Sequence, residues 1–187
     1  MKTKNRIIIA LLIIGTISFS LVQFVVVPHN IAKEKAYQTA QLDPTTHDLS
    51  RILRYSNRYM GNSSNLINLF YNLPLAEYGA RFQLFPKTLA LEVNYQTDAK
   101  SIGEEKVHKA LLYNAVTAFS LIKNLEKITY TFGDSSYDVT RANIESVFGK
   151  NLPSLLEKDA WKTNVQDKLK NRNFMRNCME KTVLEKK

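Results

Sequence analysis

The sequence predicts an α+β fold that follows an N-terminal transmembrane helix. Three observations indicate this class. Residues 7–27 carry no charge. Two pairs of short segments, within 81–95 and 128–139, alternate apolar and polar side chains as strands do. Segments with helical periodicity lie before, between and after these pairs. Together they predict a small antiparallel sheet of two hairpins with helices on one face.

The uncharged segment from Ile7 to Val27 is long enough to cross a membrane. In a helix its residues rise by about 31 Å, close to the thickness of a bilayer's hydrocarbon core. Lys2, Lys4 and Arg6 precede it, so the positive-inside rule places the N-terminus in the cytoplasm and the rest of the chain outside the cell membrane. We interpret the segment as an uncleaved, single-pass signal anchor.

A cleaved signal peptide is the main alternative for this segment. Such peptides have an apolar run of about 7–15 residues followed by a small-x-small cleavage site. Here the run is longer and ends at Val27-Pro28-His29, which offers no such site.

The rest of the chain has the size and composition of one domain. Of the 187 residues, 44% are hydrophobic, and the single cysteine excludes an intrachain disulfide scaffold. Pro44 ends a possible helix over 30–41, and the packing of the domain is expected to begin at Leu49. We therefore divide the chain into five parts: a cytoplasmic tail at 1–6, the anchor at 7–27, a spacer at 28–48, an extracytoplasmic α+β domain at 49–173 and a basic C-terminal tail at 174–187.

The sequence of the first half of the domain predicts a helix followed by a hairpin. Several capping residues in 61–64 precede a short helix over 66–73, which Pro74 ends. Residues 81–85 and 89–95 alternate as two strands, and Pro86-Lys87 supplies the turn between them.

The longest predicted helix runs from Glu104 to Leu125. Ser101 and Glu104 have the spacing of a capping box. A stripe of apolar residues at intervals of three or four should face the sheet, so Leu111 and Ile122, three turns apart, should both be buried.

A second hairpin and two more helices follow. Residues 128–132 and 137–139 predict strands, Thr140 caps a helix over 141–148, and Gly149 stops that helix. Pro153 lies near the start of a last helix that reaches Leu169.

Several segments resemble a bacterial family. Tyr59 to Asn65, Leu73-Pro74-Leu75, the hairpin from Phe82 to Tyr95, Leu112 to Ala115 and Leu121 to Leu125 are similar to the bacterial domain of unknown function 4825, over about 49–173. The resemblance implies an exported, membrane-anchored module of Gram-positive type, and it supplies neither an activity nor site residues. Family members tend to carry an acidic residue after the glycine, where this chain has Asn62.

The ionisable residues do not form a recognisable catalytic or metal motif. The three histidines, His29, His47 and His108, are far apart in sequence and have no second ligand at metal spacing. Glu104 and Glu105 are adjacent, so they face different directions on a helix and suit its positive N-terminal end. We therefore predict that Glu104, Glu105 and Asp134 are not catalytic, and we assign no catalytic, cofactor-binding or metal residues.

Other common motifs are also missing from the sequence. The glycines form neither a phosphate-binding loop nor a nucleophile elbow, and Gly61 to Ser64 is better explained as a helix cap. Cys178 lies near Arg176 and Lys181, which would favour a thiolate if the side chain were exposed.

The C-terminal stretch from Lys158 to Lys187 is basic, with acidic residues interleaved. This pattern is typical of a solvated helix face, and the alternative is attraction to anionic lipid or to a wall polymer. Nucleic acid is not expected as a partner, because the domain is predicted to face outward and no aromatic platform accompanies the charge.

From these observations we expect a non-enzymatic, membrane-anchored extracytoplasmic module that binds a partner protein or an envelope ligand. The alternative is a cell-envelope enzyme, similar to a hydrolase, whose site residues converge only in the fold. A deep pocket that joins acidic residues or His108 would favour the enzyme.

Overall fold

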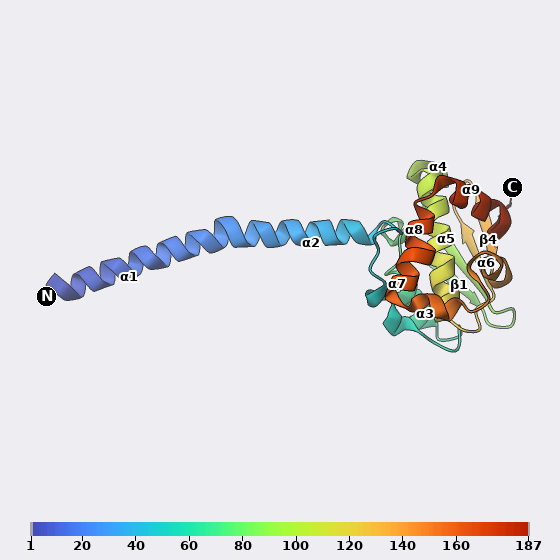
Figure 1. Ribbon diagram of the computed structural model, residues 1–187, viewed down its shortest axis with the longest axis horizontal. Helices are drawn as coiled ribbons and strands as arrows, with labels where there is room; N and C mark the ends of the chain where they lie inside the picture. The colour runs from blue at the N-terminus through green and yellow to red at the C-terminus, as the bar shows by residue number, and fades with distance from the viewer. Residues whose placement is uncertain (1, 187) are drawn as a thin grey trace. The chain divides into compact units, whose positions relative to one another are not determined.

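The computed structural model describes residues 2–186, and the chain divides between residues 40 and 41 into two compact units. The first unit is one continuous helical segment built from α1 (Lys2–Leu21), a π-helical turn η1 (Val22–Val26) and α2 (Val27–Gln41), coloured blue in Figure 1. Its large apolar side chains between Ile7 and Val27 are exposed. The helix from Thr3 to Gln41 has the length and apolar composition required to cross a membrane.

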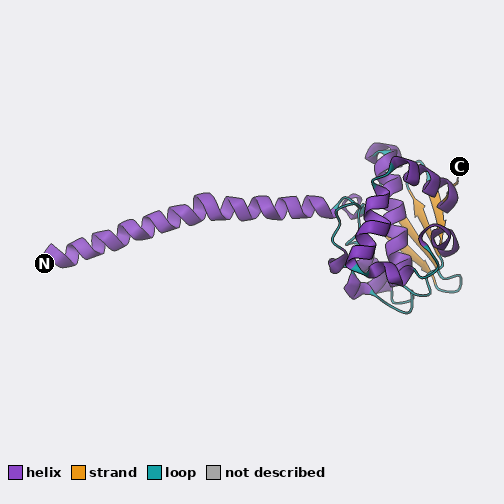
Figure 2. Ribbon diagram, viewed as in Figure 1, coloured by secondary structure: helices purple, strands orange, loops and turns teal. Residues whose placement is uncertain are grey.

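The second unit combines helices and strands (Figure 2). Its helices and strands, in chain order, are α3 (Ser63–Phe70), β1 (Ala80–Phe85), β2 (Ala90–Tyr95), α4 (Ala99–Ile102), α5 (Glu104–Leu121), β3 (Lys127–Thr131), β4 (Ser136–Thr140), α6 (Arg141–Phe148), α7 (Lys158–Trp161), α8 (Asp167–Leu169), α9 (Arg172–Thr182) and β5 (Val183–Lys186). Shorter turns of 3-10 helix are η2 (Leu49–Arg51), η3 (Leu53–Tyr55), η4 (Ala76–Tyr78) and η5 (Leu152–Leu156), and η6 (Lys162–Gln166) is a π-helical turn.

The five strands form one mixed sheet in the order β1-β2-β3-β4-β5. The two predicted hairpins are confirmed, because β1 pairs with β2 and β3 pairs with β4 in antiparallel fashion. The prediction of a purely antiparallel sheet is wrong: β2 and β3 are parallel, with Leu91 opposite Ile128. The cause is the crossover through α4 and α5, which returns the chain to the end of the sheet where β2 began.

One face of the sheet carries the core. Along β2 and β3 the buried side chains alternate with partly exposed ones, and Leu91, Val93, Ile128 and Tyr130 belong to the buried set. On the opposite face, Asp138 accepts hydrogen bonds from Thr129 and from the Lys127 ammonium. The helices therefore pack on the apolar face, as expected.

From Ala110 onward, helix α5 is buried on every side. All residues from Ala110 to Leu121 are buried. In Figure 1 the helix lies over the sheet, and η5, α6 and α9 contact it as well. Leu111 and Ile122 are both fully buried, as predicted. The helix is shorter than predicted, because Ile122 is extended and forms a parallel β-bridge with Asn57.

The predicted caps are confirmed for α6 but not for α5. Thr140 accepts a hydrogen bond from the Asn143 N–H at 3.2 Å and so caps α6, and Gly149 ends this helix with a φ of 98°. The predicted capping box is wrong. Ser101 lies inside α4, and the residue before α5 is Gly103, whose φ of 104° favours glycine.

Within the segment predicted as a basic tail at 174–187, residues 174–186 are folded, and Lys187 lies outside the described residues. Its first residues continue α9, whose buried side chains include Met175 and Cys178, and β5 then pairs with β4. The second unit also begins at Gln41, earlier than the predicted start at residue 49. The domain is therefore larger at both ends than its periodic core, because apolar residues at intervals of three or four along α9 and a short strand complete its packing.

Candidate functional site

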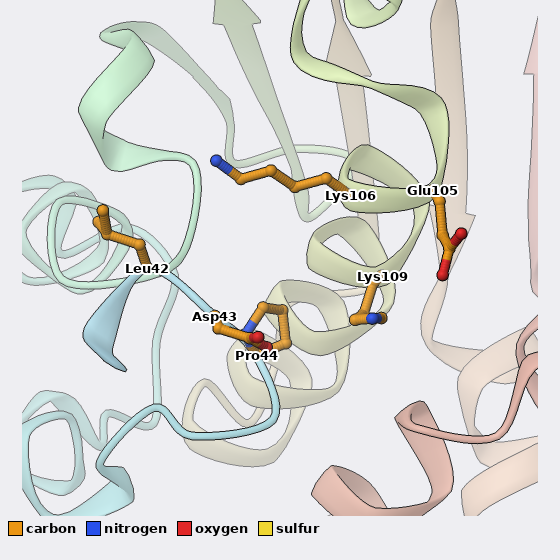
Figure 3. A pocket seen from close by; sticks show the side chains of 6 residues that line it. All are labelled: Leu42, Asp43, Pro44, Glu105, Lys106 and Lys109. Atoms are coloured by element: carbon orange, nitrogen blue, oxygen red, sulfur yellow. The ribbon is translucent and has the colours of Figure 1, made fainter. Parts of the chain in front are cut away.

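The first two turns of α5 border two open hollows, one on each side. The first hollow has a volume of about 340 Å³ and lies between these turns and the segment through which the chain enters the domain. Its lining residues are Leu42, Asp43, Pro44, Glu105, Lys106 and Lys109 (Figure 3). Figure 3 shows Lys106 and Glu105 extending in opposite directions from the helix, so the ammonium of Lys106 and the carboxylate of Glu105 serve different surroundings.

Lys106 is held in place by η4. Its Nζ lies 3.0 Å from the Glu77 carboxylate and donates to the Tyr78 hydroxyl at 3.0 Å. Partial burial opposes the charge on Lys106, but the hydrogen bonds with Tyr78 and Glu77 outweigh it, so the pKa of the ammonium is raised. The first hollow therefore has an ion pair, Lys106 with Glu77, fixed at its edge.

The second hollow is a groove between α5 and α9, which we call the α5–α9 groove. It has a volume of about 550 Å³. Met179 is partly exposed and supplies apolar surface, the buried Met175 lies beneath it, and charged side chains surround the two. The lining residues are Glu104, Glu105, His108, Arg172, Asn173, Met175, Arg176, Met179 and Glu180.

Charges of both signs alternate around this groove. The Arg172 guanidinium lies 3.8 Å from the Glu105 carboxylate, and both side chains are largely exposed, so solvent screens the pair and leaves it easy to exchange for another partner. His108 packs edge-on against the Tyr137 ring at 5.7 Å. The groove thus combines adaptable methionine surface with ionic groups that a ligand can reach.

A third polar cluster is buried where the entering segment meets α5. His47 is 3% exposed, with Nδ1 2.9 Å from the Tyr113 hydroxyl and Nε2 2.7 Å from the Asn72 carbonyl oxygen. Burial lowers the pKa of His47 and raises that of Tyr113. Both side chains are therefore neutral at pH 7.

The three histidines that the sequence singled out are separated in the structure. His29 lies exposed on α2 in the first unit, His47 is inside the domain rather than in a spacer, and His108 lines the α5–α9 groove. Within residues 2–186, no group of three histidine, cysteine or acidic side chains is arranged to hold a metal ion.

The acidic candidates have different surroundings. Glu104 and Glu105 both line the α5–α9 groove from the first turn of α5. Asp134 instead accepts a hydrogen bond from the Ala99 N–H at 2.8 Å and a longer one from Lys100. These backbone bonds lower the pKa of Asp134, which therefore stabilises the start of α4.

Cys178 is buried, unlike the exposed thiol that would favour a thiolate. Burial raises its pKa to about 11, although the hydrogen-bonding Thr182 and the nearby Lys181 and Lys168 act in the opposite direction. The thiol is thus protonated and shielded at neutral pH. Ser63 and Ser64 begin α3, and the Asn62 side chain caps that helix by accepting from Asn65 N–H.

A comparison with protein families identifies the central part of the chain. Residues 52–143 match the family described as Domain of unknown function (DUF4825). This segment is a DUF4825 domain. The match includes α3, both hairpins and α5, and it ends just inside α6. Comparisons with curated proteins and with solved structures gave no match.

The boundaries of the DUF4825 match divide each polar site. In the α5–α9 groove, Glu104 and His108 lie inside the matched segment, whereas Arg172 and Arg176 lie outside it. The same holds for the buried cluster, where Tyr113 is inside and His47 outside. Each site is therefore assembled from the DUF4825 core and a flanking segment.

Sequence reasoning missed the buried position of His47 and the contribution of α9 to a groove. The sequence did contain a signal for α9. Cys178 and Met179 lie three and four residues after Met175, a spacing that predicts an amphipathic helix. His47 gave no comparable signal, since its partners Tyr113 and Asn72 are distant in sequence.

Proposed function

We propose that this protein is a single-pass membrane protein that holds its DUF4825 domain outside the cell membrane, where the domain binds a partner protein without catalysing a reaction. The N-terminal helix supports the anchor. Its 21 uncharged residues match a bilayer core in length, at about 31 Å. The 14 residues from Pro28 to Gln41 continue the helix and add a stalk of about 21 Å.

The proposed orientation follows from charge. Lys2, Lys4 and Arg6 lie directly before the apolar segment. Lysine and arginine close to a membrane span favour the cytoplasmic side, so the second unit would be extracytoplasmic.

The α5–α9 groove is the observation that carries the binding proposal. Methionine side chains fill irregular contacts and tolerate different apolar partners. Arg172, Arg176 and Glu180 supply both signs of charge next to Met175 and Met179. A protein segment that presents apolar side chains flanked by charges suits this surface better than a uniformly anionic lipid or wall polymer does, because the acidic residues would repel such a polymer.

Site-specific photocrosslinking in native membranes tests the proposal. A photoreactive amino acid at Met179, inside the groove, should give a discrete crosslinked protein. The same amino acid at Lys150, which is exposed and does not line the groove, should not.

A charge reversal then tests whether the groove's ions contribute. Arg176→Glu should reduce the Met179 crosslink by about fivefold or more, as expected for a partner charge brought next to a like charge. Lys150→Glu makes the same charge change elsewhere and should leave the crosslink intact. Equal crosslinking from both positions, or no protein product from Met179, would contradict the proposed site.

A further inference from the structure

The segment 42–48, through which the chain passes from the stalk into the domain, is fixed by hydrogen bonds to distant elements. The Gln166 side chain of η6 donates to the carbonyl oxygens of Pro44 and His47, at 3.2 Å and 2.9 Å. The Asp48 N–H donates to the Gln41 side chain at 3.0 Å. We call this segment the entry segment.

His47 of the entry segment is buried inside the domain, at 3% exposure. Its ring touches α5 through Tyr113 and reaches the carbonyl of Asn72, just after α3. Tyr113 in turn packs edge-on against Trp161 of α7, with 5.5 Å between ring centroids. The ring therefore joins the entry segment to two separate parts of the fold.

The hydrogen bonds define the protonation state that fits this position. A carbonyl oxygen only accepts, so Nε2 of His47 must carry a hydrogen and donate it to Asn72. Nδ1 is then the acceptor for the Tyr113 hydroxyl in the neutral ring. A second ring proton on Nδ1 would have to donate to that hydroxyl, so the Tyr113 hydrogen would have to turn away from the ring. The ring would then carry a positive charge at a position that is only 3% exposed.

The charged groups around His47 do not compensate for the positive charge that a second ring proton would add. Tyr113 of α5 is neutral, because burial raises its pKa, and Gln166 and Trp161 carry no charge. The charged groups that act on His47 are Asp48, which favours the imidazolium, and Arg51, which opposes it. The two act in opposite directions, and burial is the largest influence on the ring.

We propose that protonation of His47 releases the entry segment from the domain, so that acid lengthens and loosens the connection between the stalk and the domain. Released and extended, the seven residues 42–48 span at most about 24 Å. An extracytoplasmic domain would experience external acid directly, and the device itself needs no partner and no particular orientation.

The direction of the pH effect follows from linkage. The pKa of His47 is lowered in the closed form, and a released histidine returns towards its ordinary value of about 6.5. Below that value the released form binds more protons than the closed form, so acid favours release. Above it both forms are neutral, and the hydrogen bonds keep the segment closed.

Hydrogen–deuterium exchange on the full-length chain in detergent micelles tests the proposal. Exchange is compared at about pH 7.5 and about pH 5, corrected for the intrinsic pH dependence of amide exchange. Backbone amides of residues 46–52 should lose protection by about tenfold or more at the lower pH. Peptides from α5, at residues 110–121, should stay protected in the same samples.

Two variants assign the effect to His47. In His47→Gln the amide still donates to Asn72 but does not titrate, so the pH dependence at 46–52 should disappear, whether the segment is closed or open at both pH values. In His108→Gln, which changes the histidine of the α5–α9 groove, the wild-type pH dependence should remain.

The outcomes that overturn the proposal are equally distinct. Protection at 46–52 that is unchanged at about pH 5, or a pH dependence that persists in His47→Gln, would show that His47 is not the switch. Loss of protection in α5 together with the entry segment would mean that acid unfolds the domain as a whole. None of these results bears on whether the α5–α9 groove binds a partner.

Discussion

Two uncharged helical stretches of this chain have opposite surroundings. In the first unit, the large apolar side chains between Ile7 and Val27 are exposed, with Phe24 80% accessible. In the second unit, residues 110–121 are buried throughout, with Leu111 at 0%. Both are strongly apolar in sequence, so hydrophobicity alone does not separate the exposed helix from the core helix.

Length and polar content do separate them. The first stretch has 21 residues, enough for a bilayer, whereas the second has 12 and fits a domain core. The first carries hydroxyls that its own backbone can satisfy, as Thr16 does by donating to the Ile13 carbonyl. The second carries Tyr113 and Asn114, which reach His47 and the Pro74 carbonyl on other elements. A core helix needs partners elsewhere in the fold, and an anchor does not.

The largest effect should follow a charge in the buried stretch. Leu111→Asp places a carboxylate in the centre of the core with no partner, so the domain should be unfolded or lose more than about 4 kcal/mol of stability. Circular dichroism and thermal melting of the full-length chain in detergent measure this. A cooperative transition near that of the wild type would mean that α5 is not the core of the domain.

A smaller loss is expected when the same side chain is shortened. Leu111→Ala leaves a cavity and should lower the unfolding free energy by about 2–5 kcal/mol. Lys123→Ala is the matched control. Lys123 is exposed just beyond α5, and its backbone N–H, which donates to Asn57, is retained, so the change should stay within about 0.5 kcal/mol. Equal losses from the two alanines would refute the burial of α5.

Charges in the exposed stretch should leave the domain's stability unchanged. Ile13→Lys combined with Ile14→Lys should weaken membrane insertion by about 5–7 kcal/mol, so that alkaline washing extracts the protein from membranes. The melting temperature of the domain should not move. Gln38→Lys, on α2 beyond the apolar segment, should remain membrane-bound. A lower melting temperature in the double variant would instead show that the N-terminal helix contributes to the core.

The sequence allowed the local structure to be predicted more fully than the sheet topology. The two hairpins and the central helix follow from periodicity, and the Thr140 cap and Gly149 stop follow from side-chain chemistry. The parallel pairing of β2 with β3 is a property of the connection, because a helical crossover between two hairpins returns the second one in the parallel sense. That rule was applicable to the predicted order of elements, so this part of the fold was predictable in principle.

Other features depended on contacts that no local pattern reveals. The strand β5 comprises only Val183 to Lys186, and it exists because it completes the sheet beside β4. The burial of His47 depends on Tyr113, 66 residues away. The α5–α9 groove likewise exists only because α9 packs beside α5. Candidate sites of this kind are formed by tertiary packing, whereas the proposed anchor is a property of one continuous segment.

Cysteine accessibility in intact cells tests the central claim, that the domain is anchored with its bulk outside the membrane. Cys178 is buried and its pKa is raised to about 11, so the native thiol should give little background. A membrane-impermeant maleimide should label Lys150→Cys in intact cells, and it should label Thr3→Cys only after the cells are permeabilised. The reverse pattern, with Thr3→Cys labelled in intact cells and Lys150→Cys protected until lysis, would contradict the account.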